Sequence, residues 1–253
     1  MQTLLDHPIV LLLVSFVILW TATRLGASLQ IRRGPLNESE RADFDIVLGA
    51  TLTLLSLLVG FTFSMASSRY DQRKNYEADE ANAIGTAYAR AELLPSADAT
   101  KVRQLLREYT DLRIHFYTTS DRAQVRALDS ATRRKQAQLW GAVAAAARTA
   151  PTPTSALAAS AMNDTLNSQA YSQAAAWNRI PLGAWVLLYV LGAVATIMIG
   201  YRFRMGARHY LLMLIVPATV AIAFFLVADI DCPHRGVIRV APENLQALAP
   251  SLT

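Results

Sequence analysis

The stretch GFTFSMASSRYDQRKNYEADEANAIGTAYARAELLP, from Gly60 to Pro95, decides the fold. It passes from apolar into charged residues after Ser67 and meets no helix breaker before Pro95, and only Gly85 weakens it. Alanine, glutamate and arginine are abundant in it, and all three favour the helix. We therefore predict one continuous helix, about 70 Å long, that leaves a bilayer and enters solvent.

Four long apolar stretches without a charged residue lie in two pairs near the two ends of the chain. They run from Pro8 to Thr23, Ile46 to Ser67, Ile180 to Tyr201 and Tyr210 to Ala228. A helix needs about 20 apolar residues to cross a hydrocarbon core about 30 Å thick. The sequence therefore predicts four transmembrane helices in two pairs, with a polar insert between the pairs.

The insert shows helical spacing of apolar residues and no strand-like alternation. After the long helix we predict three more. They run over 100–119, from the caps Ser120 and Asp121 to about residue 147, and over 155–177 after the turn APTPT at 150–154. This pattern is typical of an antiparallel helical bundle. We predict an all-α membrane protein with membrane segments 1–67 and 180–229, a soluble insert 68–179 and a tail 230–253.

The composition agrees with a membrane protein and excludes several functions. Of the 253 residues 53% are hydrophobic and 17% are charged, and the net charge is +5; soluble chains average about 25% charged residues. No basic run interleaved with aromatics suggests nucleic-acid binding. The single cysteine, Cys232, excludes an intrachain disulfide and a cysteine metal site.

Catalytic motifs are missing from the sequence. None of the four histidines pairs with another at i+3 or i+4, and no P-loop, GxSxG or GxGxxG occurs. We therefore expect no enzyme, no cofactor and no firm metal site.

Two short loops are rich in arginine. The loop from Arg24 to Arg41 holds four arginines, and the loop from Tyr201 to His209 holds three. Short arginine-rich loops stay in the cytoplasm. We therefore predict that the insert and both termini lie on the outer side, and the opposite topology is the alternative.

Small and hydroxyl-bearing residues recur along the second span. Gly49, Thr53, Ser56, Gly60 and Ser64 are spaced by 4, 3, 4 and 4 residues, which puts them on one helical face. Two interpretations remain open: close packing against another helix, or the wall of a polar pathway.

Two aromatic residues next to this face have two interpretations as well. Phe61 and Phe63 flank the small residues. They either form a hydrophobic constriction that gates a pore, or contact lipid and protein.

Charged residues gather where the long helix leaves the membrane. Arg69, Arg73 and Glu77 are spaced by four and share a face, with Glu80 beyond them. The group is either a salt-bridged face or a vestibule in which Arg69 and Arg73 attract anions.

Two carboxylates follow the fourth span. Asp229 and Asp231 either pair with Arg235, Arg179 or Arg69, or serve as oxygen ligands for calcium. Glu77 and Glu80 are further acidic candidates for such a cation site or for interfacial salt bridges.

Three stretches of the sequence carry a resemblance to a known family. They are the stretch from Gly60 to Pro95, the motif NRIP at 178–181, and ADIDCPHRGVIRV from Ala228 to Val240. Together they resemble the bacterial bestrophin-like membrane family, whose layout of two spans, helical insert and two spans covers the whole chain. The last stretch departs from the family pattern Asp-Leu-Asp-Arg-Pro at Ile230 and Cys232.

The resemblance implies a function and a location. Bestrophins are pentameric, calcium-gated anion channels, so the likeness implies a homo-oligomeric, anion-permeable pore, which we expect the second span to line. It also implies a multi-pass protein of the bacterial inner membrane, which would make the outer side periplasmic. The expected partners are the lipid bilayer, further copies of the chain and an inorganic anion. The alternative is a non-conducting scaffold or sensor whose insert binds a protein or ligand.

Overall fold

The computed structural model describes residues 7–202 and 210–252, and within these ranges every regular element is a helix. Four helices are long and apolar enough to cross a membrane. The prediction of an all-α membrane protein is therefore confirmed. Part of the arginine-rich loop at 201–209 lies outside the described residues.

The helices follow the chain in a simple order. The long helices are α2 (Pro8–Arg33), α3 (Glu38–Arg90), α4 (Ser96–Thr118), α5 (Arg122–Thr149), α6 (Pro153–Trp177), α7 (Leu182–Arg202) and α8 (Tyr210–Asp231). A 3₁₀ turn, Ala91–Leu93, ends α3. The short helix α9 (Glu243–Leu248) and a second 3₁₀ turn, Ala249–Ser251, follow at the end of the chain.

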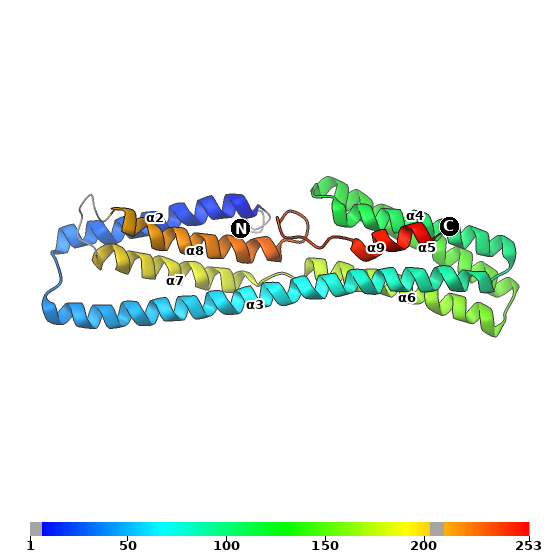
Figure 1. Ribbon diagram of the computed structural model, residues 1–253, viewed down its shortest axis with the longest axis horizontal. Helices are drawn as coiled ribbons and strands as arrows, with labels where there is room; N and C mark the ends of the chain where they lie inside the picture. Colours follow the sequence, from blue (N-terminus) through cyan, green and yellow to red (C-terminus); the bar gives the residue numbers. More distant parts are fainter. Residues whose placement is uncertain (1–6, 203–209, 253) are drawn as a thin grey trace. The chain divides into compact units, whose positions relative to one another are not determined.

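The long helix predicted from the opening stretch is present as α3, which runs unbroken through 53 residues (Figure 1). That length corresponds to about 80 Å. It begins at Glu38, eight residues before the apolar stretch, and passes Gly85 without interruption.

The chain divides into two compact units. The membrane unit comprises residues 1–68 and 179–238, and the insert unit comprises residues 69–178 and 239–253. The last 15 residues thus belong to the insert unit, whereas the sequence suggested a separate tail from residue 230. The boundary in α3 falls one residue after the predicted one.

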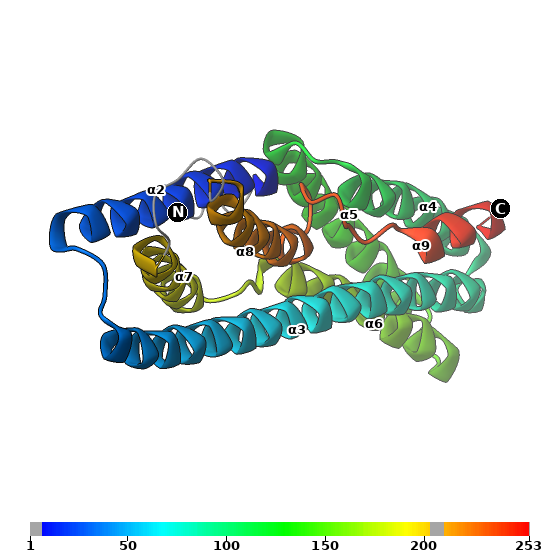
Figure 2. The same cartoon turned by 60° about the vertical axis from the view of Figure 1, so that its left-hand side comes forward.

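Within the membrane unit, α2 packs against both α7 and α8 (Figure 2). Glycines allow the closest approach: a Cβ at Gly26 would lie 1.9 Å from Ile197 O, and one at Gly200 would lie 1.9 Å from Thr23 O. Trp185 and Phe224 are fully buried and meet edge to face between α7 and α8.

The first part of α3 lies beside α7 (Figures 1 and 2). Asp45 accepts hydrogen bonds from Arg202 at 2.7 and 3.1 Å, and Phe44 stacks on Tyr201 with ring centroids 5.7 Å apart. These contacts hold one end of the membrane half of α3 to the end of α7.

The insert unit is a helical bundle in which α4 packs on α5 and α5 on α6. Local caps fix its turns: Asp121 accepts from the backbone of Ala123 and Gln124 at the start of α5, and Thr152 forms a capping box with Ser155 at the start of α6. The prediction that Asp121 caps this helix is confirmed.

The core of the insert unit takes in residues from its helices and from the end of the chain. Its buried members include Ile84 from α3, Leu106 from α4, Leu139 from α5 and Met162 from α6. Leu245 and Leu252, from the last 15 residues, are buried in the same core. The C-terminal segment is therefore part of the bundle.

Candidate functional site: the open face of α3

The membrane half of α3 is much less covered by its own chain than the other spans. Only 11% of its most apolar window is buried, against 33% for α2 and 44% for α8. In the membrane the uncovered faces of this span therefore meet lipid, another protein molecule or the water of a pore.

Three stripes of side chains run along this half of α3, each following a seven-residue spacing. Leu55 and Thr62, with Ala66, are buried against the chain. Shifted by one residue, or about 100° around the helix, come the exposed Val47, Leu54, Phe61 and Met65 on one side. On the other side lie the small and hydroxyl-bearing residues identified in the sequence.

The small-residue face is open within the chain. Its members, Gly49, Thr53, Ser56, Gly60 and Ser64, are all exposed. A Cβ added at Gly49 or Gly60 would meet no described atom within 4 Å. Close packing of this face therefore has no counterpart among the described residues of the same chain, although the same residue type does pack closely at Gly26 and Gly200.

Two hydroxyl groups of the open face are bonded inside their own helix. Thr53 donates to Gly49 O at 2.9 Å, and Ser56 donates to Thr53 O at 2.9 Å. Each oxygen keeps a lone pair that points away from the helix. The face can thus lie against an apolar neighbour or offer acceptors to water.

Phe61 and Phe63 do not share a face. Two residues apart on a helix, they project about 160° from one another. Phe63 follows Gly49 and Ser56 at seven-residue intervals and is 40% exposed, whereas Phe61 follows Val47 and Leu54 and is 58% exposed. Phe63 lies about 60° and Phe61 about 100° from the middle of the small-residue face, so Phe63 is the nearer of the two.

The charged group on the insert half of α3 is mostly buried. Arg73 is 5% exposed, Glu77 1% and Glu80 0%, whereas Arg69 is intermediate. Of the two arginines predicted to attract anions, Arg69 is thus the more accessible.

Glu77 holds the C-terminal segment. Its carboxylate accepts from the backbone N–H of Leu245 at 2.9 Å and from the Asn244 amide at 2.6 Å. These groups belong to the first turn of α9, which has no side-chain cap of its own. A carboxylate at a helix N-terminus satisfies free N–H groups and meets the positive end of the dipole.

Glu80 pairs with Arg113 of α4 in the middle of the bundle. The guanidinium donates to both carboxylate oxygens, and both side chains are fully buried. Tyr117 and Ser172 lie against the pair and bond to each other at 2.6 Å. Burial by itself lowers the pKa of Arg113, but the adjacent Glu80 raises it more, so the net shift is upward.

Sequence reasoning missed Arg113 as a partner of Glu80. A signal was present, because Arg113 lies on the inward face of α4 together with Leu106, Tyr109 and Phe116. An arginine among apolar inward positions needs a buried acid. Burial also raises the pKa of the Tyr109 and Tyr117 hydroxyls, so both stay neutral.

Asp229 and Asp231 clamp backbone at the end of α8. Asp229 accepts from the N–H groups of Val237 and Ile238 at 2.7 and 2.8 Å, and a Cβ at Gly236 would come within 2.3 Å of Asp229 O. Each carboxylate oxygen of Asp229 is thus bonded to a backbone N–H of the segment that follows α8, and the glycine lets that segment turn back.

Asp231 clamps the segment that precedes α7. Both its oxygens lie 3.2 Å from the N–H of Ile180, and Arg179 Nε is 3.5 Å away. The predicted contact with Arg179 is present. Arg235 lies with its Nη1 2.8 Å from His7 Nε2. Among the described residues, no group of three or more acidic, histidine or cysteine side chains is arranged to hold a metal ion.

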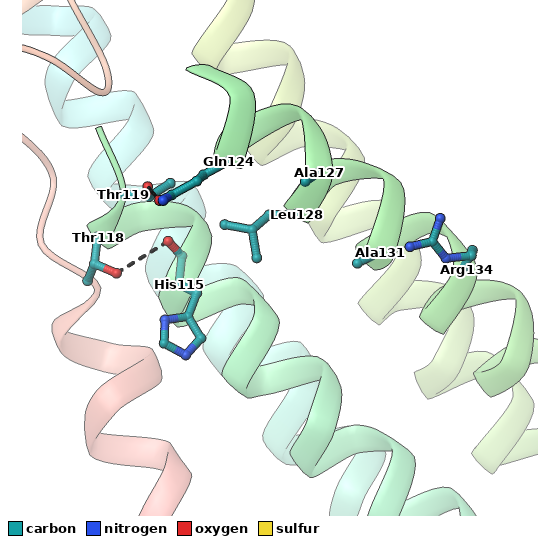
Figure 3. Close-up of a pocket in the computed structure, with 8 residues that line it drawn as sticks. All are labelled: His115, Thr118, Thr119, Gln124, Ala127, Leu128, Ala131 and Arg134. Atoms are coloured by element: carbon teal, nitrogen blue, oxygen red, sulfur yellow. Dashed lines mark hydrogen bonds between the residues drawn. The ribbon is translucent and has the colours of Figure 1, made fainter. Parts of the chain in front are cut away.

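A groove of about 710 Å³ lies between α4 and α5 near the turn that joins them (Figure 3). Leu128 and Ala131 give it an apolar floor, and His115, Gln124 and Arg134 stand at its edges. It offers a ligand or a peptide a concave surface on the insert.

Comparison with known proteins identifies the family. The model of the bestrophin-like domain matches residues 9–245. The chain therefore belongs to the bestrophin-like family, as its motifs suggested.

Solved structures share the fold. A bacterial bestrophin homologue from Klebsiella pneumoniae, solved by Zn-SAD phasing, is 15% identical with a TM-score of 0.64, and the match covers 96% of this chain and 95% of that one. A single-substitution variant of the homologue is 14% identical with a TM-score of 0.65, covering 95% and 93%. At this identity the likeness establishes the fold alone. None of the curated proteins matches the chain.

Proposed function

We propose that the protein is a homo-oligomeric, anion-permeable channel in which the small-residue face of α3 lines the pore. The observation that carries the proposal is the exposure of this face in a span that buries only 11% of its apolar window. A helix with one stripe packed on its own chain and two stripes open can contact a neighbouring copy with one and face a shared axis with the other.

The distribution of side chains along the two open stripes supports this arrangement. The large residues Val47, Leu54 and Phe61 present apolar surface suited to lipid or to a neighbouring subunit. The opposite stripe has glycines that leave room and hydroxyl oxygens that hydrate. Phe63 lies on the pore side of this arrangement and forms its narrowest hydrophobic ring.

Anion preference comes from arginine at the mouth of the pore. Arg69 follows the last pore-lining position, Ser64, by five residues and is the more accessible of the two arginines. A ring of Arg69 side chains, one from each copy, raises the local concentration of an inorganic anion such as chloride. Calcium is not required in this scheme.

Chloride flux from liposomes tests the channel directly. Vesicles with purified protein should release chloride faster than empty vesicles, and Phe63→Ala should raise the rate several-fold. Phe61→Ala is the matched control because it removes the same side chain from the other open stripe, and it should leave the rate within a factor of two. Flux equal to that of empty vesicles would refute conduction.

Mass measurement in native detergent tests the assembly. Four spans per chain enclose a pore only when several copies share an axis, so we expect three or more copies. A monomer or a dimer would remove the shared axis and with it the pore.

The proposed location is the bacterial inner membrane, with the insert and both termini in the periplasm. The only cysteine, Cys232, is buried, so a cysteine introduced at an exposed site reports topology cleanly. Arg148→Cys, at the end of α5, should react with a membrane-impermeant maleimide in intact cells. Labelling only after lysis would reverse the topology.

A non-conducting sensor or scaffold is the second proposal, favoured by the groove between α4 and α5. In this case the insert binds a protein or small ligand there. Absence of flux together with a defined partner that is lost in Leu128→Arg would support it over the channel.

A further inference from the structure

A buried polar layer crosses the insert and draws on every long helix of the bundle. Glu80 comes from α3, Arg113 and Tyr109 from α4, and Ser172 from α6. Gln136 of α5 bonds to the Tyr109 hydroxyl and donates to Gln169 of α6 at 3.0 Å. Polar groups this deep need hydrogen-bond partners at nearly every atom.

Two atoms of this layer lack a protein partner among the described residues. They are Nη1 of Arg113 and Oγ1 of Thr132, and both residues are 0% exposed. The remaining nitrogens of Arg113 donate to Glu80 and Ser172. A buried hydrogen-bonding group without a partner is destabilising. Two such groups close to one another therefore suggest that they share a partner.

The register of α4 and α5 brings these two residues to the same level. The antiparallel pair is fixed by Lys135 donating to Glu108 and by the bond between Gln136 and Tyr109. Thr132 lies one helical turn from Gln136 on α5, and Arg113 lies one turn from Tyr109 on α4, both towards the loop that connects the two helices.

We propose that a single water molecule binds in the core of the insert between Arg113 Nη1 and Thr132 Oγ1. It accepts a hydrogen bond from the guanidinium and donates one to the threonine hydroxyl. Buried waters hold such positions, bonding two to four otherwise unpartnered polar groups.

The charges around the site select water over an anion. Glu80 already neutralises Arg113 through two hydrogen bonds, so the remaining N–H groups need a neutral acceptor. An added anion would lie in a dry core next to the Glu80 carboxylate and be repelled by it. The buried Phe116, whose ring centroid lies 4.4 Å from Arg113 Cζ, also limits the space for a ligand.

The water completes the polar layer. It adds Thr132 of α5 to the hydrogen-bonded group of Glu80, Arg113 and Ser172, which the Tyr109 hydroxyl already joins to Gln136. The four helices then share one hydrogen-bonded network that is satisfied in only one register, and a shifted helix would leave several groups unpaired.

The sign of a stability change tests the proposal in the full-length protein. Thr132→Val replaces the hydroxyl by a methyl group of similar size. If the water is present, this substitution removes one of the water's two hydrogen-bond partners. The midpoint of thermal unfolding should then fall by about 5 °C. Without the water it would remove an unsatisfied hydroxyl and raise the midpoint, which would overturn the proposal, as would an unchanged midpoint.

Two variants control for the chemistry of the substitution. Thr132→Ser keeps the hydroxyl and should retain most of the stability lost in Thr132→Val. Thr110→Val removes an equally buried hydroxyl that already bonds to Leu106 O within its own helix, and it should shift the midpoint by much less.

An experimental density map that resolves ordered solvent gives an independent answer, even if the valine variant fails to fold. A peak within hydrogen-bond distance of both Arg113 Nη1 and Thr132 Oγ1 is expected. A direct bond between the two side chains, or apolar atoms filling the space, would overturn the proposal.

Discussion

The contact between α2 and α7 and the membrane half of α3 contain the same kinds of small residues but use them differently. At Gly26 and Gly200 the absent side chain lets two backbones touch, because a Cβ there would lie 1.9 Å from a carbonyl oxygen. At Gly49 and Gly60 a Cβ would meet nothing within 4 Å. Small residues in a span are therefore no sign of intrachain packing until their neighbours are known.

The largest effect is expected where the backbones touch. Gly200→Ala forces α2 and α7 apart along their contact and should destabilise the membrane unit by more than about 4 kcal/mol, so that little folded protein is recovered. Chemical unfolding in detergent, followed by circular dichroism, measures this. Gly183→Ala lies on the same helix with open space around it and should fold normally; equal damage from both would show that helix packing is not the cause.

On the open small-residue face of α3, replacing a glycine by alanine should raise the stability of the chain and not lower it. Gly60→Ala adds a methyl group that meets no described atom of the same chain, and alanine favours the helix over glycine, so the single chain should gain about 0.5–1 kcal/mol. Unfolding of the isolated subunit in dissociating detergent is the appropriate measurement. A clear loss of stability there would mean that part of the same chain covers this face.

Gly192 is the intermediate case and should change least among the glycines. A Cβ there would lie 3.1 Å from Leu19 Cδ2 and 3.6 Å from the Phe224 ring. The leucine tip can rotate away, so the gain in helix propensity and the cost of the contact should cancel to within about 0.5 kcal/mol. A loss comparable to that of Gly200→Ala would show that the side chains of Leu19 and Phe224 cannot move away from this part of α7.

Removing a surface ion pair in the insert should change the stability least of all these substitutions. Lys135 hydrogen-bonds Glu108 and so lowers the pKa of that carboxyl below its ordinary value of 4.5. A lowered pKa contributes stability above pH 4.5 that disappears as the pH falls through the folded-state pKa. Lys135→Ala should therefore be slightly less stable than the wild type at neutral pH and equal to it in stronger acid, as measured by thermal unfolding at several pH values. A difference that grows with acidity would contradict this sign.

For much of the candidate site, the sequence predicted which face of the helix each residue occupies but not what covers that face. The spacing of Gly49, Thr53 and Gly60 correctly placed them on one face, because helical periodicity is local. Whether that face was covered depended on where α2, α7 and α8 pack. The same limit applied to Phe61 and Phe63, which the sequence grouped by adjacency and the helix separates by about 160°.

The insert shows the same division. Its helices and the cap at Asp121 were legible from the chain, but the pairing of Glu80 with Arg113 joins residues 33 positions apart. Sequence reasoning instead considered Arg73 and Arg69 as partners, since they are near in the chain. The hold of Glu77 on α9, across 168 residues, carries no local signal.

The sequence by itself determined the four apolar spans, the unbroken helix through the membrane boundary, the all-helical insert and the family. Each follows from hydrophobic runs, helix propensity or short motifs, which act between residues close in the chain. Only the tertiary structure decided which face of α3 remains uncovered, which acid Arg113 neutralises and which unit receives the last 15 residues. Those outcomes depend on shape and burial between distant segments, and no single segment contains that information.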